Sequence, residues 1–145
     1  MIISYLNWWH KKMSEVIENP VDIAMSLMHD SKNAMVMTND EFRIVFANRA
    51  AEIHYASLGV KELQGRSIKE CHDESFAAKL DYLYEMFRGR KIAIFEAQFP
   101  AGEQVNRFSY IPVFDDTEKG EVFCGVLEMQ VLDSADSLLN CADSD

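Results

Sequence analysis

Cysteine is scarce in this 145-residue chain: Cys71, Cys124 and Cys141 are widely spaced and form no Cys-x-x-Cys pair. The sequence therefore lacks the ligand spacing of a zinc knuckle and the dithiol of a redox motif. No apolar run approaches the ~20 residues of a membrane span, so no integral membrane contact is expected. The first residues do not resemble a signal peptide, because Lys11 and Lys12 come too late to form its basic start. These absences predict a cytoplasmic protein.

Basic side chains are too few for a nucleic-acid-binding surface. The formal net charge is −10 at pH 7, whereas phosphate binding needs a basic face. The charge is also uneven, since residues 1–114 hold 15 acidic and 13 basic side chains while residues 115–145 hold 9 acidic and one basic. We expect no nucleic-acid partner, and an acidic end that is either a solubilising tail or a docking surface for a basic partner.

Signatures of catalysis are also missing. The sequence has no Gly-rich phosphate loop, no Gly-x-Ser-x-Gly elbow and no His-Glu-x-x-His site. Asp73 and Glu74 follow His72, but neighbours in sequence seldom converge on one substrate atom, and solvation at the surface explains these carboxylates better. We therefore expect that the protein is not an enzyme.

The residues that are present predict one globular α+β domain. Hydrophobic residues make up 48% and aromatic residues 11% of the chain, enough for a core at this length. Apolar periodicity predicts helices over residues 1–18, 20–31, 49–55 and 73–88, and strands over residues 34–38, 43–47, 91–99, 105–114 and 121–131. Two strands alone cannot bury a face, so all five are expected in one antiparallel sheet with short helices on one face.

Three residues are expected to mark helix ends. Asn48 is a plausible N-cap for the helix that follows it, because its side chain can accept from the first backbone N–H groups. Gly89 closes the long helix at the position that glycine favours. Asn19-Pro20 separates the first two helices.

The N-terminal helix is amphipathic. Its apolar stripe consists of Ile2, Leu6, Trp9, Met13 and Val16. This spacing suits dimerisation or capping of the chain's own sheet. Membrane-surface binding is a third reading, disfavoured because nearby acidic residues offset the only two lysines.

Three segments, in this order, resemble those of a PAS domain. They are a hairpin leading into an Asn and a small-residue helix (residues 39–52), a stretch ending in Gly-Arg-Ser (residues 58–67), and a last strand with a glycine inside it (residues 120–127). The resemblance implies a PAS domain over residues 33–132, preceded by an N-terminal helical segment (residues 1–32) and followed by an acidic tail (residues 133–145).

A narrower resemblance involves one histidine. Cys71-His72 followed by Ser75, together with Leu127-Glu128 in the last strand, resembles a PAS subgroup with a Cys-His-x-x-x-Ser segment. In CO-sensing regulators with a PAS haem pocket, a histidine at about this place binds the iron. The resemblance thus implies His72 as a possible haem ligand. In the alternative reading, His72 or Asp73 caps the following helix.

Methionines and aromatics could line a pocket for an apolar ligand such as a fatty acid or a flat ring. The candidates are Met35, Met37, Tyr82, Met86, Phe95, Phe108, Phe123 and Met129. They could equally fill an ordinary core.

The sequence therefore predicts a stand-alone sensory or interaction module. A ligand or redox event in its pocket would shift the N-terminal helix between two arrangements and signal in trans to a partner protein. A haem-based gas or redox sensor using His72 is one alternative. The other is an enzyme on a curved-sheet scaffold like the cone-shaped isomerase and dehydratase folds.

Overall fold

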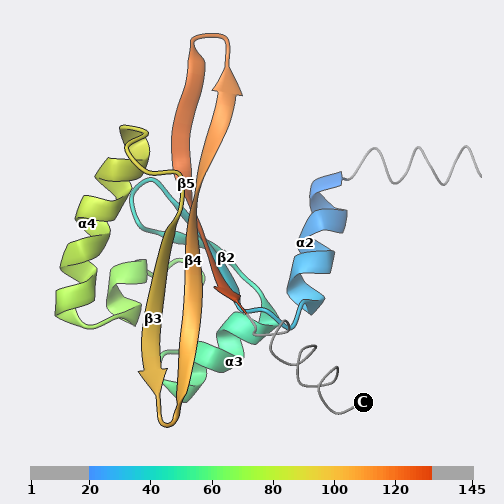
Figure 1. The fold of residues 1–145 in the computed structure, drawn as a ribbon. Coiled ribbons are helices and arrows are strands. Elements are labelled where there is room, and N and C mark those ends of the chain that lie inside the picture. The colour runs from blue at the N-terminus through green and yellow to red at the C-terminus, as the bar shows by residue number, and fades with distance from the viewer. Residues whose placement is uncertain (1–19, 132–145) are drawn as a thin grey trace, which may run out of the picture.

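The computed structural model describes residues 20–131 and contains five strands, three α-helices and one 3₁₀ helix within them (Figure 1). In chain order these elements are α2 (Pro20–Asp30), β1 (Met35–Asn39), β2 (Ile44–Ala47), α3 (Arg49–Ser57), η1 (Ile68–Cys71), α4 (Glu74–Arg88), β3 (Phe95–Ala101), β4 (Gln104–Thr117) and β5 (Gly120–Val131). The amphipathic stripe and the acidic tail lie outside the described residues. Between residues 20 and 131, no helix is both long and apolar enough to cross a membrane.

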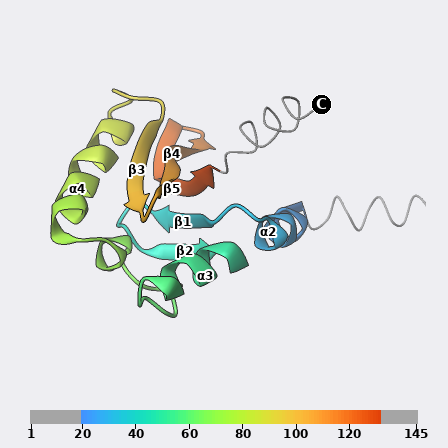
Figure 2. The ribbon, with the colours of Figure 1, turned by 60° about the horizontal axis from the view of Figure 1, so that its bottom comes forward.

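The five strands form one antiparallel sheet in the order β2-β1-β5-β4-β3. The last strand therefore lies at the centre, between β1 and β4. In Figure 2, α4 lies beside the β3–β5 end of the twisted sheet and α3 lies beside β2. This arrangement confirms the expected α+β fold. The hairpin of β1 and β2 also precedes α3 and α4, an order that argues against the cone-shaped scaffold.

The strand ends differ from the expectation. The predicted loops at residues 100–103 and 115–120 shrink to residues 102–103 and 118–119, and β3 begins at Phe95 rather than at residue 91. Pro100 fits inside β3 because this strand is at the edge of the sheet, where a missing N–H donor is tolerated. The paired strands β4 and β5 extend well beyond the body of the molecule (Figure 1). Polar residues continue this hairpin past the apolar runs, so hydrophobicity alone underestimated its length.

Local signals place the ends of the three described α-helices to within two residues. The side chain of Asn48 caps α3, and the side chain of Asp73 caps α4 by accepting from the Phe76 N–H at 2.8 Å. Gly89 ends α4 with an ordinary φ of −82°, while Arg90 takes the left-handed conformation with a φ of 55°. Helix α4 therefore ends at Arg88, as expected, but the left-handed turn falls on Arg90 rather than on Gly89.

The core lies between one face of the sheet and the helices α3 and α4. Alternate residues of the strands point into it, as the period of a strand requires. Buried side chains from the sheet are Val36, Ile44, Phe108, Tyr110, Phe123 and Val126, and those from the helices include Ala51, Tyr55, Leu80, Leu83, Tyr84 and Phe87.

Candidate functional site

A carboxyl group is buried at the centre of this core. Glu128, on the inner face of β5, is only 3% exposed. The Tyr55 hydroxyl donates to its Oε1 at 2.5 Å, and His72 Nε2 lies 3.8 Å from its Oε2. Tyr110 is the direct partner of Glu128 on the neighbouring strand β4. These four residues, Tyr55, His72, Tyr110 and Glu128, are called the Glu128 cluster below.

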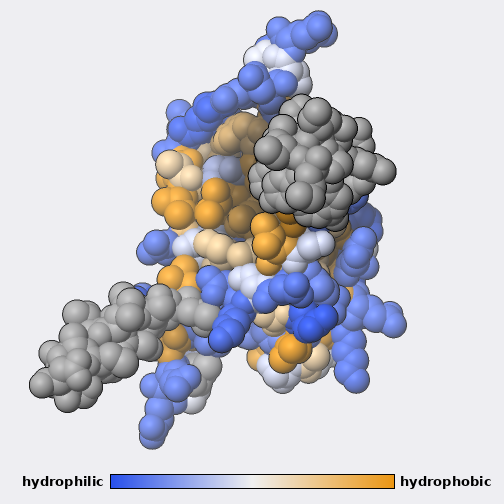
Figure 3. Space-filling view, turned by 90° about the vertical axis from the view of Figure 1, so that its right-hand side faces the viewer, coloured by the Kyte–Doolittle hydropathy of each residue, from blue (hydrophilic) through white to orange (hydrophobic). Residues whose placement is uncertain are grey.

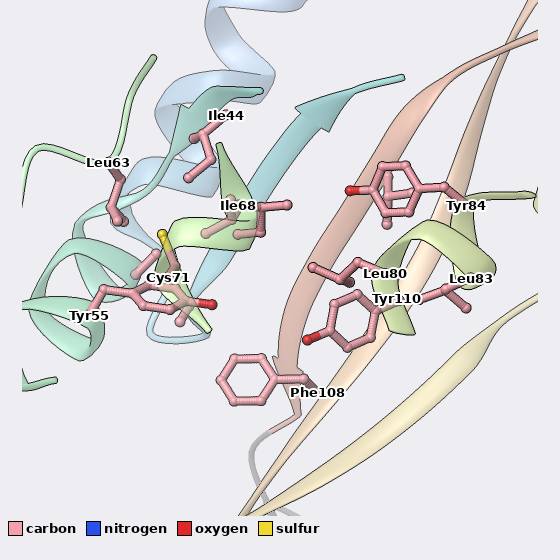
Figure 4. Close-up of a cluster of buried hydrophobic side chains, with 14 of the residues drawn as sticks. Ile44, Tyr55, Leu63, Ile68, Cys71, Leu80, Leu83, Tyr84, Phe108 and Tyr110 are labelled. Carbon is pink, nitrogen blue, oxygen red and sulfur yellow. The ribbon is translucent and has the colours of Figure 1, made fainter. Parts of the chain in front are cut away.

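Four different elements bring the Glu128 cluster together. Tyr55 lies in the last turn of α3, and Figure 4 shows its hydroxyl and that of Tyr110 pointing toward one another across the core. His72 directly follows η1, which begins at the Ser67 cap and buries Ile68. The cluster therefore depends on the whole fold rather than on a local motif.

Two atoms of the Glu128 cluster lack a hydrogen-bond partner within residues 20–131. They are the Tyr110 hydroxyl and Glu128 Oε2, and both are buried. A buried polar atom without a partner costs about 1–3 kcal/mol, so proteins keep few of them. These two atoms mark the place in the core where a water molecule or a polar group of a ligand would find partners.

Glu128 also shapes the electrostatics of its neighbours. Burial raises the pKa of Tyr55 and of Tyr110, and the Glu128 carboxyl raises both further. The same two causes raise the pKa of Cys71 to about 11. Burial lowers the pKa of His54, although Glu128 opposes this shift. The tyrosine hydroxyls and the Cys71 thiol therefore remain protonated at neutral pH, and the Cys71 thiol is a poor nucleophile there.

We predict that the protein loses stability in alkali partly through Cys71. Its thiol is neutral in both states below pH 9, the ordinary pKa of 9.0, but only the unfolded state ionises between pH 9 and about 11. The raised pKa thus lowers the free energy of unfolding as pH rises, by up to about 1.4 kcal/mol per pH unit in this window. Urea titrations of the wild type and Cys71→Ser from pH 8 to 11 measure the slope. The variant should show the shallower fall, and equal slopes would contradict the assignment.

An apolar cavity lies between α4 and the edge strand β3. Its volume is about 280 Å³. Apart from Lys79, its lining is apolar or aromatic: Phe76, Leu80, Tyr82, Leu83, Met86, Ile92 and Phe95. The ring of Phe76 connects the cavity to the Glu128 cluster, because its centroid lies 4.6 Å from that of His72 and 6.0 Å from that of Tyr110.

The haem hypothesis can be compared with the position of His72. Its Nε2 lies 3.5 Å from the Tyr55 hydroxyl, whose proton goes to Glu128. The same Nε2 lies 3.8 Å from Glu128 Oε2, so this side of the imidazole faces the buried polar groups of the Glu128 cluster. His72 also does not line the cavity. These residues do not fit a haem in this arrangement. Within residues 20–131, no three metal-binding side chains gather at one place either.

The pocket candidates from the sequence are divided between three places. Tyr82, Met86 and Phe95 line the cavity, whereas Phe108 and Phe123 lie in the core away from it. The other three candidates, Met35, Met37 and Met129, are corrected. Their strand neighbours point into the core, so these methionines lie on the opposite face of the sheet and cannot line the cavity. The candidate dimer residues Ile2, Leu6, Trp9, Met13 and Val16 lie outside the described residues.

Sequence reasoning missed most of the Glu128 cluster. It singled out His72, but Tyr55 and Tyr110 passed as ordinary aromatics and Glu128 only as part of a resemblance. One signal was available: Glu128 interrupts the apolar strand at a position two residues from Val126, where the alternation predicts a buried side chain.

We predict that Tyr110→Phe leaves the ligand-free protein at least as stable as the wild type. The change removes a buried hydroxyl without a partner, so the free energy of unfolding should stay equal or rise by about 1 kcal/mol. Tyr84→Phe is the matched control, because its hydroxyl bonds to Thr38 Oγ1 at 2.5 Å in the same core. That variant should lose about 1–2 kcal/mol. Urea unfolding of refolded protein measures both, and an equal loss in the two variants would refute the prediction.

Comparisons with known proteins agree with this architecture. The sequence matches the PAS domain family over residues 32–129. A C-terminal domain from Streptococcus mutans superposes with a TM-score of 0.58 at 20% identity, covering 76% of this chain and 82% of its own. The PAS domain of BvgS from Bordetella pertussis gives 0.56 at 14% identity, with 86% and 96% covered.

A third similar structure is a PAS domain from a two-component sensor histidine kinase. Its TM-score is 0.53 at 14% identity, and the alignment covers 79% of this chain and 96% of that one. A search of curated proteins found no match. These structural likenesses concern the fold, while the family match extends over most of the sequence. The chain therefore belongs to the PAS domain family.

Proposed function

We propose that the protein is a sensory module that binds a small ligand in the cavity between α4 and β3 and signals to a partner protein. The observation that carries this proposal is the apolar cavity beside a buried polar cluster with unpartnered atoms. Ligand sites have this composition: mostly apolar walls and a few polar groups that orient the ligand. One similar structure comes from a sensor histidine kinase, which supports a role in sensing. The function is binding, without a catalytic step.

Native mass spectrometry of the purified full chain tests this proposal, because it reports the mass of the protein and of any retained ligand together. We expect a bound small molecule in the wild type. Met86→Trp should displace it, since the larger ring fills the cavity that Met86 lines. Leu58→Trp is the control, because Leu58 is 61% exposed and does not line the cavity. A wild type without ligand, or a ligand retained in Met86→Trp, would refute the proposal.

Exposed apolar surface favours a second role, homodimerisation. Helix α2 buries none of its residues, and Val21 and Leu27 are 67% and 71% exposed. Figure 3 shows the side of the molecule that faces away from α4, and apolar side chains gather on this side. The outer face of the sheet contributes Met35, Met37, Val113, Leu127, Met129 and Val131. An exposed apolar surface of this kind is typical of an interface, so we propose that a second copy of the chain covers it.

Light scattering after size exclusion tests the dimer. We expect a dimer of the full chain, and a monomer both for Leu27→Glu and after deletion of residues 1–18. Leu58→Glu is the matched control, because it puts the same charge on an exposed leucine just after α3. It should leave the dimer intact. A dimer that survives Leu27→Glu and the deletion would remove this role.

A further inference from the structure

The two unpartnered atoms of the Glu128 cluster belong to residues that are direct partners in the sheet. Tyr110 and Glu128 are 1% and 3% exposed. They face each other directly across β4 and β5, on the same side of the sheet. The Tyr110 hydroxyl and Glu128 Oε2 are therefore available to one and the same polar group, provided by a molecule from outside the chain.

Two aromatic rings lie next to Tyr110 and also line the cavity. Phe95 is the partner of Tyr110 on its other side, in β3, and its ring centroid lies 6.0 Å from that of Tyr110. The Phe76 ring lies at the same distance. Both phenylalanines also line the cavity. A ligand in the cavity would thus reach Tyr110 once the Phe76 ring, at the start of α4, turns aside.

The size and walls of the cavity favour a single aromatic ring. An apolar cavity of roughly 150 Å³ is enough to bind benzene, and this one has about 280 Å³. It therefore has room for one ring with a short substituent. Phe76, Tyr82 and Phe95 provide aromatic walls against which a ring can pack in offset or edge-on geometry.

The polar atoms of Tyr110 and Glu128 determine which substituent the ring of the ligand should carry. A carboxylate oxygen only accepts hydrogen bonds, so the ligand must donate to Glu128 Oε2. The Tyr110 hydroxyl can donate, so the same ligand atom should accept from it. A hydroxyl does both. A carboxylate would face the Glu128 carboxyl, and an ammonium would have to lose its water shell beside His72. A neutral hydroxyl avoids both costs.

We propose, on the basis of the proposed function, that the cavity binds a single-ring phenol whose hydroxyl donates to Glu128 Oε2 and accepts from the Tyr110 hydroxyl. The ring of the ligand lies among Phe76, Tyr82 and Phe95. Tyr110 and Glu128 act as the residues that distinguish a phenol from a plain hydrocarbon of the same shape.

Isothermal titration calorimetry of the ligand-free full chain with 4-ethylphenol and ethylbenzene tests this inference. These probes differ by one hydroxyl. We expect 4-ethylphenol to bind at least about tenfold more tightly, as two hydrogen bonds in a buried site allow. Tyr110→Phe should reduce this ratio by about threefold or more and leave the affinity for ethylbenzene unchanged. Tyr84→Phe, which removes a hydroxyl bonded to Thr38, should leave both affinities unchanged.

The outcomes separate the inference from the proposed function. Equal affinity for the two probes, or an unchanged ratio in Tyr110→Phe, overturns the phenol inference but leaves a ligand-binding cavity in place. Binding of neither probe also overturns the inference. In that case the proposed function still depends on whether native mass spectrometry finds another molecule, displaced by Met86→Trp.

Discussion

Asn48→Ala should lower the free energy of unfolding by about 4 kcal/mol, one of the two largest effects expected for a single substitution in this chain. Asn48 is fully buried, and its side chain makes four hydrogen bonds. Its Oδ1 accepts from the backbone N–H groups of Met35 and Ala51, both at 2.9 Å, and its Nδ2 donates to the carbonyls of Met28 and Asn33, both at 2.7 Å. Alanine would remove all four of these bonds, and of the two carbonyls only that of Met28 would keep another donor, the Ser31 N–H at 3.2 Å. The loss of the α3 cap accounts for only about 1 kcal/mol of the total.

Two further variants sharpen this test. Asn39→Ala is the matched control, because the Asn39 side chain also accepts from two backbone N–H groups, but near the surface. It should cost about 1 kcal/mol. Asn48→Asp keeps the acceptor and directs a second carboxylate oxygen at two carbonyls, so it should be destabilised at neutral pH and partly recover in acid. Urea unfolding measures all three variants. A loss in Asn48→Ala no larger than in Asn39→Ala would show that the buried network contributes little.

Gly125→Ala is the second large effect, with an expected loss of about 4 kcal/mol. Gly125 lies in β5 opposite Asn39 of β1. A Cβ at this position would lie 1.8 Å from the Thr38 carbonyl oxygen and 2.8 Å from its carbon. Backbone atoms of a paired strand cannot move aside like a flexible side chain. The substitution should therefore separate β1 from β5 at this end of the sheet.

Hydrogen exchange of the amides shared by β1 and β5, together with urea unfolding, tests the effect of Gly125→Ala. The control is Gly102→Ala in the short β3–β4 loop. Gly102 has a φ of +65° and nothing within 4 Å of its would-be Cβ, so alanine there meets backbone strain without a clash. That strain costs about 1 kcal/mol. Similar losses in the two variants would mean that β1 and β5 can move apart locally at little cost.

Asn48 and Gly125 show which structural features could be predicted from the sequence and which could not. The cap that Asn48 provides to α3 is a local signal and was predicted from its neighbours. Its bonds to Met28, Asn33 and Met35 depend on where α2 and β1 lie, which no local pattern encodes. In the same way, the close approach at Gly125 follows from β5 lying next to β1, although about 80 residues separate them along the chain.

The candidate site was harder to predict than the fold for a related reason. Strand alternation separates Met35 and Met37 from Val36 but does not say which set faces the helices. The sequence therefore could not assign the methionines to a face. The Glu128 cluster combines side chains from α3, the segment after η1, β4 and β5, and its existence depends on their tertiary arrangement.

The contact between Asn48 and Met28 has a mechanical consequence. Helix α2 has 11 residues and none of them is buried, so the amide of Asn48 holds it at its C-terminal end. From Met28 to Pro20 the helix measures about 12 Å, so a turn of about 10° at Met28 would move Pro20 by about 2 Å. The Asn48 side chain thus joins the C-terminal end of α2 to the first turn of α3, the helix that carries Tyr55.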